Sequence, residues 1–228
     1  MAAIDIVIVG ITGRMGKTLI NEIGKQKDFN LLGGVSLKYT LPDLKIYSSV
    51  TDLLKVLKPQ VIIDFSSPNI LDSFMKTPSI PLVIGTTGYT EKEFSSLYEL
   101  SKTRPVFYSA NFSLAVAIMK KTAGQIAKNL PLFTTEIIES HHKTKKDKPS
   151  GTALKLAEEL KKDTPIHSIR AGKIIGEHEV LFIGDEERLS LKHEAFSRNI
   201  FAQGALTAAK FIIFKKNGLY FMEDLLIL

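Results

Sequence analysis

One segment of this 228-residue chain brings imidazole, ammonium and hydroxyl groups close together. His141 and His142 are followed by Lys145, and Ser150-Gly151-Thr152 stands directly before an amphipathic stretch. The start of a helix binds a carboxylate through its N–H groups. Nearby Lys and His side chains add charge-assisted hydrogen bonds of roughly 1.5–3 kcal/mol each when they are shielded from water. The segment is therefore suited to a small dianion, although a solvated basic loop is the simpler interpretation of such a charge run.

The histidine pair does not by itself predict a metal site. Adjacent residues of a strand point to opposite faces, so His141 and His142 would not share a ligand sphere, and no third ligand stands out. The chain also contains no cysteine, which excludes thiolate metal sites and a cysteine nucleophile. The sequence accordingly predicts no metal.

A second segment is suited to binding phosphate, because it follows the apolar run Ile4–Val9 and opens a predicted helix that extends to about Lys25. Its residues are Gly10, Ile11, Thr12, Gly13, Arg14, Met15 and Gly16. A helix start offers N–H groups, and glycines allow a pyrophosphate to approach the backbone. The spacing is Gly-x-x-Gly-x-x-Gly, with Thr12 in the place of the usual second glycine, so a purely structural turn remains the alternative.

The end of the second predicted strand bears on which dinucleotide would bind. An acid at this place recognises a ribose 2′-hydroxyl, and a basic group recognises a 2′-phosphate. The chain reads Ser36-Leu37-Lys38 here, with no acid and one lysine. We therefore expect NADPH to be favoured and NADH to be possible, with an exposed loop lysine as the alternative role for Lys38.

Two further polar segments follow predicted strand ends, where open α/β sheets bind ligands. They are Gly85-Thr86-Thr87-Gly88 and Ser109-Ala110-Asn111-Phe112. Small hydrogen-bonding residues at these places suit a flat nicotinamide ring. Thr and Asn are equally suited to capping helices, so each segment alone is a weak indication.

The scaffold that carries these segments changes along the chain. Short apolar strands alternate with amphipathic stretches up to about residue 108, which predicts a parallel sheet with helices on both faces. Then come a predicted helix at 114–129, a strand at 134–140, a helix at 152–162, and strands near 166–171, 178–183 and 188–194 that are spaced like a meander. A helix at about 201–216 could return to the first half.

Composition limits the class of protein. Apolar residues make up 44% and charged residues 24%, which is ordinary globular usage and excludes general disorder. The net charge of +6 favours anionic partners, but no helix shows a continuous basic face, so we expect no nucleic acid. No stretch reaches the roughly 18 apolar residues of a spanning helix, and the N-terminus does not resemble a signal peptide. We expect a cytoplasmic protein that does not bind membranes.

Taken in order, these segments resemble the 4-hydroxy-tetrahydrodipicolinate reductase (dihydrodipicolinate reductase) family. The matching segments are Gly10–Gly16, Asp64-Phe65-Ser66, Gly85–Gly88, Ala110–Ser113, Glu139–Ala153, Ile174–His178 and Ser197-Arg198. The resemblance implies an α/β fold with a Rossmann-like nucleotide-binding domain and a mixed α/β domain for substrate binding and oligomerisation. The expected bounds are 1–112, completed by about 203–228, for the first domain and 113–202 for the second.

The resemblance also implies a reaction in the diaminopimelate route to lysine. NADPH or NADH would reduce (2S,4S)-4-hydroxy-2,3,4,5-tetrahydrodipicolinate, a small dicarboxylate, to tetrahydrodipicolinate with loss of water, in a homotetramer. His141 and Lys145 would transfer protons, with Lys145 the favoured donor, and substrate carboxylates would bind at His142, Lys145, Gly151 and Thr152. The cofactor would contact Gly10, Ile11, Thr12, Gly13, Arg14, Met15, Gly16, Lys38, Gly85, Thr86, Thr87, Ser109, Ala110, Asn111 and Phe112. Leu37 stands where many members place an acid, which favours NADPH.

Another NAD(P)-dependent two-domain oxidoreductase with a different anionic substrate is the alternative. It would keep the glycine turn but would need no His-His-x-x-Lys segment.

Overall fold

The computed structural model of the chain describes residues 2–37 and 41–227. Its contacts divide into two compact units, each of which is described by itself. Unit 1 extends up to Phe112 and resumes at Asn199, and unit 2 is Ser113–Arg198. The C-terminal segment therefore belongs to unit 1 from Asn199 onward, slightly before the expected position of about 203.

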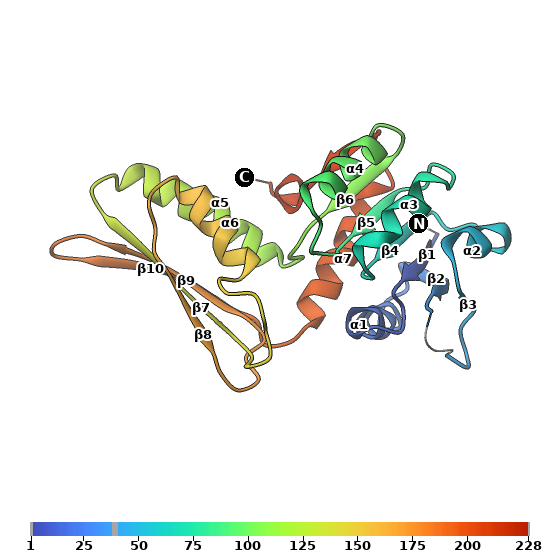
Figure 1. Cartoon of the computed structure of the whole chain (residues 1–228), viewed down its shortest axis with the longest axis horizontal. Helices are drawn as coiled ribbons and strands as arrows, with labels where there is room; N and C mark the ends of the chain where they lie inside the picture. The colour runs from blue at the N-terminus through green and yellow to red at the C-terminus, as the bar shows by residue number, and fades with distance from the viewer. Residues whose placement is uncertain (1, 38–40, 228) are drawn as a thin grey trace. The chain divides into compact units, whose positions relative to one another are not determined.

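A parallel sheet forms the centre of unit 1 (Figure 1). In chain order its strands are β1 (Ile4–Val9), β2 (Phe29–Val35), β3 (Ile46–Tyr47), β4 (Val61–Asp64), β5 (Leu82–Ile84), β6 (Pro105–Tyr108) and β11 (Gly218–Tyr220). They are ordered β11-β6-β5-β4-β1-β2-β3, and each neighbouring pair is parallel. β4 and β5 are buried along their whole length, as strands covered on both faces must be.

The helices of unit 1 form two groups. They are α1 (Arg14–Ile23), α2 (Val50–Val56), α3 (Leu71–Met75), α4 (Glu91–Ser101) and α7 (Asn199–Ile212), with short 3₁₀ turns η1 (Pro68–Ile70) and η2 (Met222–Leu225). α1 contacts α7, while α3 contacts both α2 and α4 (Figure 1). This arrangement confirms the predicted Rossmann-like sheet.

The strand order creates a switch point at β1. The chain passes from β1 to β2 on one side, and β4 pairs with the other side of β1. Open α/β sheets bind ligands outside the carboxyl ends of the strands at such a point. The glycine turn follows β1, and the segments at Phe65, Gly85 and Ser109 follow β4, β5 and β6, so all four lie at the same edge of the sheet.

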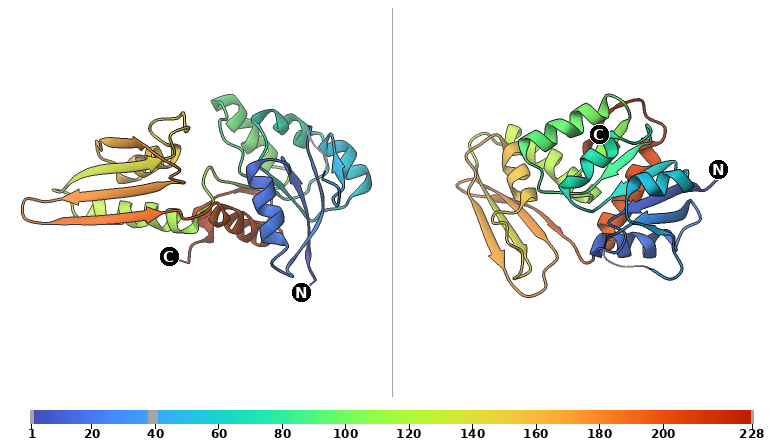
Figure 2. Two further views of the ribbon diagram at one scale, coloured as in Figure 1. Left: turned by 90° about the horizontal axis from the view of Figure 1, so that it is seen from below. Right: turned by 45° about the vertical axis from the view of Figure 1, so that its right-hand side comes forward.

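Unit 2 is a mixed sheet with two helices on one face (Figure 2). Its elements are α5 (Leu114–Asn129), β7 (Thr134–His141), α6 (Gly151–Leu160), β8 (Ile166–Arg170), β9 (Glu177–Ile183) and β10 (Arg188–Glu194). Apolar side chains of α5 and α6 pack on Ile137, Val180 and Phe182. These three residues come from β7 and β9, so the core of unit 2 lies between the helices and this face of the sheet.

The predicted meander is wrong in one respect. The strand order is β10-β9-β7-β8, so β7 lies between β8 and β9, although β9 and β10 do form the expected antiparallel pair. β8 pairs with β7 in parallel, because α6 crosses between them and makes a β–α–β unit. Among the described residues, no helix combines the length and the apolar character needed to cross a bilayer.

Candidate active site

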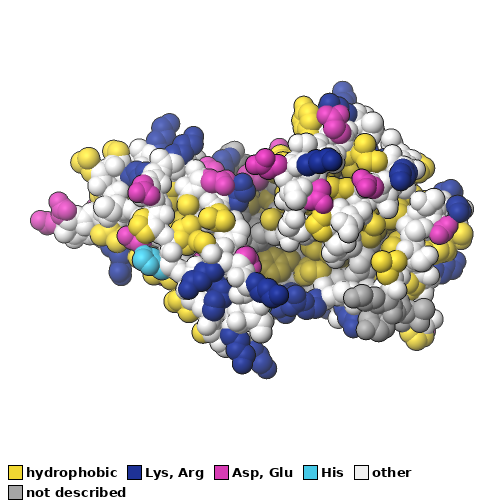
Figure 3. Space-filling model, viewed as in Figure 1, with side chains coloured by type: hydrophobic (Ala, Val, Ile, Leu, Met, Phe, Trp, Pro, Cys, Tyr) yellow, Lys and Arg dark blue, Asp and Glu magenta, His cyan; other side chains and the backbone are white. Residues whose placement is uncertain are grey.

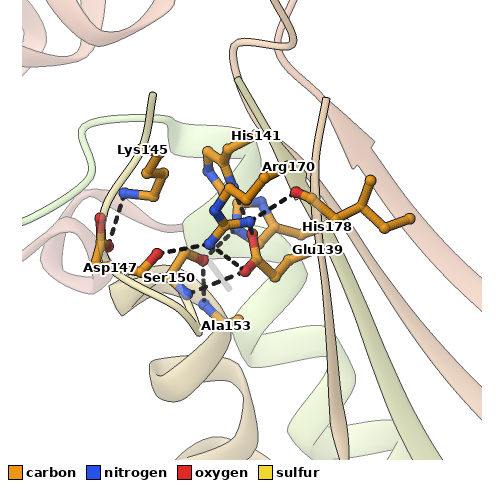
Figure 4. Close-up of polar contacts among 9 residues, drawn as sticks. Glu139, His141, Lys145, Asp147, Ser150, Ala153, Arg170 and His178 are labelled. Carbon is orange, nitrogen blue, oxygen red and sulfur yellow. Dashed lines mark hydrogen bonds and ion pairs between the residues drawn. The ribbon is translucent and has the colours of Figure 1, made fainter. Parts of the chain in front are cut away.

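The polar site of unit 2 begins at the carboxyl end of β7, where Glu139 and His141 project from the same face of the strand (Figure 4). Residues two apart on a strand share a face. Nδ1 of His141 lies 2.5 Å from Oε2 of Glu139. Glu139 has no exposed surface and His141 is also buried, so this contact is shielded from water.

Arg170, the last residue of β8, reaches the same carboxylate. Its two terminal nitrogens donate to the two oxygens of Glu139 at 2.9 and 2.7 Å. β7 and β8 are paired with His141 opposite Arg170, which brings the guanidinium to this end of the sheet. Arg170 also donates to the backbone carbonyl of Asp147 at 2.7 Å and thereby holds the loop that follows β7.

The start of α6 completes this group. Ser150 is the N-cap, and its Oγ accepts a hydrogen bond from the Ala153 N–H at 3.3 Å. The Ser150 N–H donates to Glu139 at 3.3 Å, and Ser150 Oγ lies 3.2 Å from Nε2 of His178 on β9. The predicted residues Gly151 and Thr152 are the first two of α6. A side-chain atom at Gly151 would meet nothing within 4 Å, so the backbone there is open to a ligand.

The loop between β7 and α6 carries the lysines. Nζ of Lys145 pairs with Asp147 at 2.7 Å, with side chains that are 24% and 56% exposed. Nδ1 of His142 lies 2.8 Å from the Thr144 hydroxyl. Figure 3 shows Lys and Arg side chains gathered where β7 and β8 end. Lys145 is thus held by an exposed partner that another anion can replace.

Charge and burial set the ionisation of this group. Burial raises the pKa of Glu139, but the Arg170 guanidinium and further hydrogen bonds outweigh it and lower that pKa to about 2. Burial lowers the pKa of His141, and Glu139 partly offsets this. Burial, with His141 nearby, lowers the pKa of His178 to about 3. At neutral pH the site therefore combines an ionised carboxylate with two neutral imidazoles.

The glycine turn of unit 1 fits a dinucleotide pyrophosphate. Gly13 caps α1 without a side-chain hydrogen bond, and the first turn of the helix carries no acid. A Cβ on Gly16 would lie 2.3 Å from the Ile11 carbonyl oxygen, so only glycine lets the helix pack this closely on the turn. Arg14 is exposed at the first position of the helix. The helix start therefore presents N–H groups and positive charge to an anion.

Other predicted cofactor residues of unit 1 hold the loops at the sheet edge. The hydroxyl of Thr12 lies 2.6 Å from that of Ser36, which joins the glycine turn to the end of β2. Ser109 accepts from the Asn111 N–H and donates to its carbonyl. Leu37 is 86% exposed, while Lys38 lies outside the described residues.

Asp64 is a buried carboxyl at this edge that sequence reasoning gave no role. The hydroxyl of Thr86 donates to it at 2.7 Å, and the backbone N–H of Ser66 donates at 3.1 Å. Burial raises the pKa of Asp64 to about 6 in spite of these hydrogen bonds. Thr86 is therefore turned inward to Asp64, whereas its neighbour Thr87 is exposed. Among the described residues, no group of three or more His, Asp or Glu side chains could hold a metal ion.

Comparison with known proteins shows which family the chain belongs to. The N-terminal part of dihydrodipicolinate reductase matches residues 4–112, and its C-terminal part matches residues 115–226. The chain is 38% identical over 248 residues to 4-hydroxy-tetrahydrodipicolinate reductase of Caldanaerobacter subterraneus subsp. tengcongensis, with 97% of this chain and 98% of the relative covered. The chain belongs to the dihydrodipicolinate reductase family.

Other relatives agree with this assignment. The reductase of Thermosipho africanus is 39% identical over 222 residues, with 96% of each chain covered. The solved dipicolinate-bound dihydrodipicolinate reductase of Paenisporosarcina sp. TG-14 is similar in fold, with a TM-score of 0.82, 24% identity, and 98% of this chain and 100% of that chain covered. Membership confirms the expected family and an oxidoreductase that uses a nicotinamide cofactor.

In this member of the dihydrodipicolinate reductase family, the predicted site residues form two groups, one in each unit. His141, Lys145, Gly151 and Thr152 gather in unit 2, and the glycine turn and the segments after β5 and β6 gather at one sheet edge of unit 1. Sequence reasoning missed the contacts of Glu139, Arg170 and His178. Glu139 lies near the end of the strand predicted at 134–140 and His141 directly follows it; this spacing of two residues was a signal that could have linked them.

Proposed function

We propose that this chain reduces 4-hydroxy-tetrahydrodipicolinate, with loss of water, to tetrahydrodipicolinate in lysine biosynthesis. The supporting observation is that the basic loop, the buried His141 and the open start of α6 meet at one end of the unit 2 sheet. Relatives at 38–39% identity over nearly the whole chain carry this name. We assign nucleotide binding to unit 1 and substrate binding to unit 2.

The substrate is a dicarboxylate, and the proposed site offers cationic and N–H groups to it. One carboxylate would bind at the start of α6, where Gly151 stands at the first helical position and helices provide no carbonyl partner for its N–H. Thr152 lies beside it on the same turn. The second carboxylate would take the place of Asp147 at Lys145, with His142 alongside.

Proton transfer is assigned to Lys145 and His141. The nicotinamide, when bound, supplies a hydride to a carbon of the conjugated ring that remains after water is lost. The adjacent carbon then takes a proton, and the Lys145 ammonium is the proposed donor, with His141 as its companion in proton transfer. The neutral state of His141 leaves it able to accept a proton at the edge of the ring that faces away from Glu139.

The cofactor would be held by unit 1. The segment Gly10–Gly16 would hold the pyrophosphate, and the segments Gly85–Thr87 and Ser109–Phe112 would contact the nicotinamide end. We propose a preference for NADPH because Leu37 supplies no acid for a ribose 2′-hydroxyl. NADH remains a usable alternative in this proposal.

We also propose that the chain forms a homotetramer through the face of the unit 2 sheet opposite α5 and α6. Ile138, Leu181 and Ile183 alternate with the residues that pack on the helices, and they are only partly buried. Ile169, on the same face as Ser140 in the β7–β8 pair, is 47% exposed. Apolar residues on an uncovered sheet face are suited to contacts with other copies of the chain. Analytical ultracentrifugation would measure the oligomeric state.

The test is an assay coupled to the upstream synthase that follows the oxidation of NADPH and NADH separately. We expect turnover with both, and a higher kcat/KM with NADPH. Replacing Lys145 by Ala should lower kcat at least 100-fold, within the range for general acid catalysis, while the Kd for NADPH changes less than threefold. Lys146→Ala, an exposed lysine of the same loop, is the matched control.

Three outcomes would contradict parts of this proposal. Wild-type enzyme that oxidises NADPH only with another anionic substrate would favour a different two-domain oxidoreductase. Near-normal kcat in Lys145→Ala would remove that residue from catalysis. Equal or better kcat/KM with NADH would overturn the cofactor preference.

A further inference from the structure

Glu139 is a carboxylate without exposed surface whose two oxygens each accept more than one hydrogen bond. Oε1 accepts from Arg170 at 2.7 Å and from the Ser150 N–H at 3.3 Å. Oε2 accepts from the other Arg170 nitrogen at 2.9 Å and faces Nδ1 of His141 (Figure 4). A buried charge is tolerated only when its charge and lone pairs are matched in this way. The carboxylate therefore joins two strands to the start of a helix.

The contact with Glu139 decides which nitrogen of His141 can exchange a proton. An ionised carboxylate only accepts hydrogen bonds, so the hydrogen between the two groups lies on Nδ1. Nε2 is then the atom that gains and loses a proton. Gly176 leaves space beside Nε2, because a Cβ on Gly176 would lie only 3.2 Å from it. His141 is thus held with its reactive edge away from Glu139.

The same carboxylate also holds the groups that we assign to the substrate. Glu139 fixes the Ser150 backbone, and Ser150 caps α6 through the Ala153 N–H. Its partner Arg170 holds the carbonyl of Asp147, and Asp147 is the residue that pairs with Lys145. A shift of Glu139 would therefore move His141, the helix start and the lysine loop together.

We propose that Glu139, clamped by Arg170, is the positioning residue of this reductase: it sets the tautomer of His141 and the place of the carboxylate-binding start of α6. The proposal rests on the proposed function for the identity of the reaction. Glu139 is not a catalytic residue in it, because the carboxylate is buried and acts through the groups that it contacts, which are His141, Ser150, Ser168 and Arg170.

Burial and three charged groups act on the protonation of His141. Burial lowers its pKa, Glu139 raises it, and the charges of Lys145 and Arg170 lower it. The ring of His178 on β9 packs edge-on with its centroid 5.2 Å away. Glu139 is thus the group that favours the protonated imidazole, and its loss should lower the pKa of His141 further.

The test uses the full chain with Glu139→Gln combined with Arg170→Gln. Replacing both partners avoids leaving one buried charge alone, which destabilises proteins strongly. Glu158→Gln combined with Lys155→Gln removes an exposed ion pair of α6 and is the control for loss of one ion pair in unit 2. ¹⁵N NMR of labelled histidine reports the tautomer and the titration of His141, and steady-state kinetics reports kcat and KM across pH.

We expect wild-type His141 to carry its hydrogen on Nδ1 and the double variant to show a mixture of tautomers. In the variant, the pKa of His141 and the matching limb of the pH profile of kcat/KM should fall, because the raising effect of Glu139 on this pKa is larger than the lowering effect of Arg170. By analogy with residues that orient metal-ligating histidines, kcat should fall about 10- to 100-fold, with the Kd for NADPH within twofold of wild type.

The proposal is overturned if wild-type His141 carries its hydrogen on Nε2, a result that needs no variant to fold. It is also overturned if the double variant keeps the wild-type tautomer, pH profile and kcat. Absence of turnover in the wild type would contradict the proposed function instead, and the NMR result would still decide whether Glu139 orients His141.

Discussion

Replacing Asp64 by Asn should stabilise unit 1 at pH 8 and give no gain at pH 4. The carboxyl of Asp64 has no exposed surface, and burial raises its pKa to about 6 from an ordinary value of 3.8. The folded state therefore favours the protonated acid. The stability contributed by this group is fully present below pH 3.8 and is lost as pH rises through about 6.

The magnitude follows from the size of that shift. A change from 3.8 to about 6 is roughly 2 pH units, which corresponds to about 3 kcal/mol of penalty at pH 8. Asn keeps an acceptor for the Ser66 N–H but must meet the Thr86 hydroxyl with an N–H, and a rearranged hydrogen bond costs about 1 kcal/mol. We therefore expect Asp64→Asn to gain about 2 kcal/mol at pH 8 and to lose up to about 1 kcal/mol at pH 4.

The assay is urea unfolding followed by circular dichroism from pH 4 to pH 8, for wild type and variant. Because a chain of two units need not unfold in one step, hydrogen exchange of the β4 and β5 amides should report on unit 1 directly. Asp43→Asn, at an exposed position, controls for the loss of one carboxyl. Parallel pH dependences in wild type and Asp64→Asn would refute the argument that burial raises the pKa of this acid.

Two further substitutions test the site in unit 2. Ser150→Ala removes the cap of α6 and a partner of His178. It should lower the free energy of unfolding by about 1–2 kcal/mol and raise the KM for substrate. An unchanged KM would argue against substrate binding at this helix start. Gly176→Ala places a Cβ 3.2 Å from Nε2 of His141 and should lower kcat about threefold to tenfold, because small displacements of reacting groups are costly. Wild-type kcat in that variant, measured in the coupled assay, would show that the Nε2 edge is not used.

The parallel sheet of unit 1 could be predicted because its signals are local. The apolar run Ile4–Val9 and the glycine turn after it mark a strand and the start of a helix, and this strand and helix form as expected. β3 (Ile46–Tyr47) was not predicted, because two residues at the edge of a sheet carry no periodicity. The meander-like spacing of the last three strands wrongly predicted that β8 pairs with β9. The helix between β7 and β8 indicates instead that these two strands are a parallel pair.

The candidate site could be predicted only where neighbouring residues in the sequence act together. The segment Ser150-Gly151-Thr152 predicts a helix start, and α6 does begin at Gly151. The pairing of Glu139 with Arg170 depends on the register of β7 against β8, which places His141 opposite Arg170. No pattern within either strand specifies that register, so the contact of Arg170 with Glu139 could be found only from the three-dimensional structure.

Two ion pairs of unit 2 differ in burial. The buried pair contains Arg170 and holds the structure, whereas the exposed pair contains Lys145 and leaves this cation available to a substrate. Arg170 and Glu139 have side chains that are 13% and 0% exposed, and breaking such a buried pair costs about 3–5 kcal/mol. Lys145 and Asp147 are 24% and 56% exposed, and exposed pairs contribute roughly 0–1 kcal/mol. A substrate carboxylate can therefore displace Asp147 at small cost but cannot take Arg170 from Glu139. Lys145 is therefore the cation that can contact the substrate, and the buried pair keeps its positioning role when substrate binds.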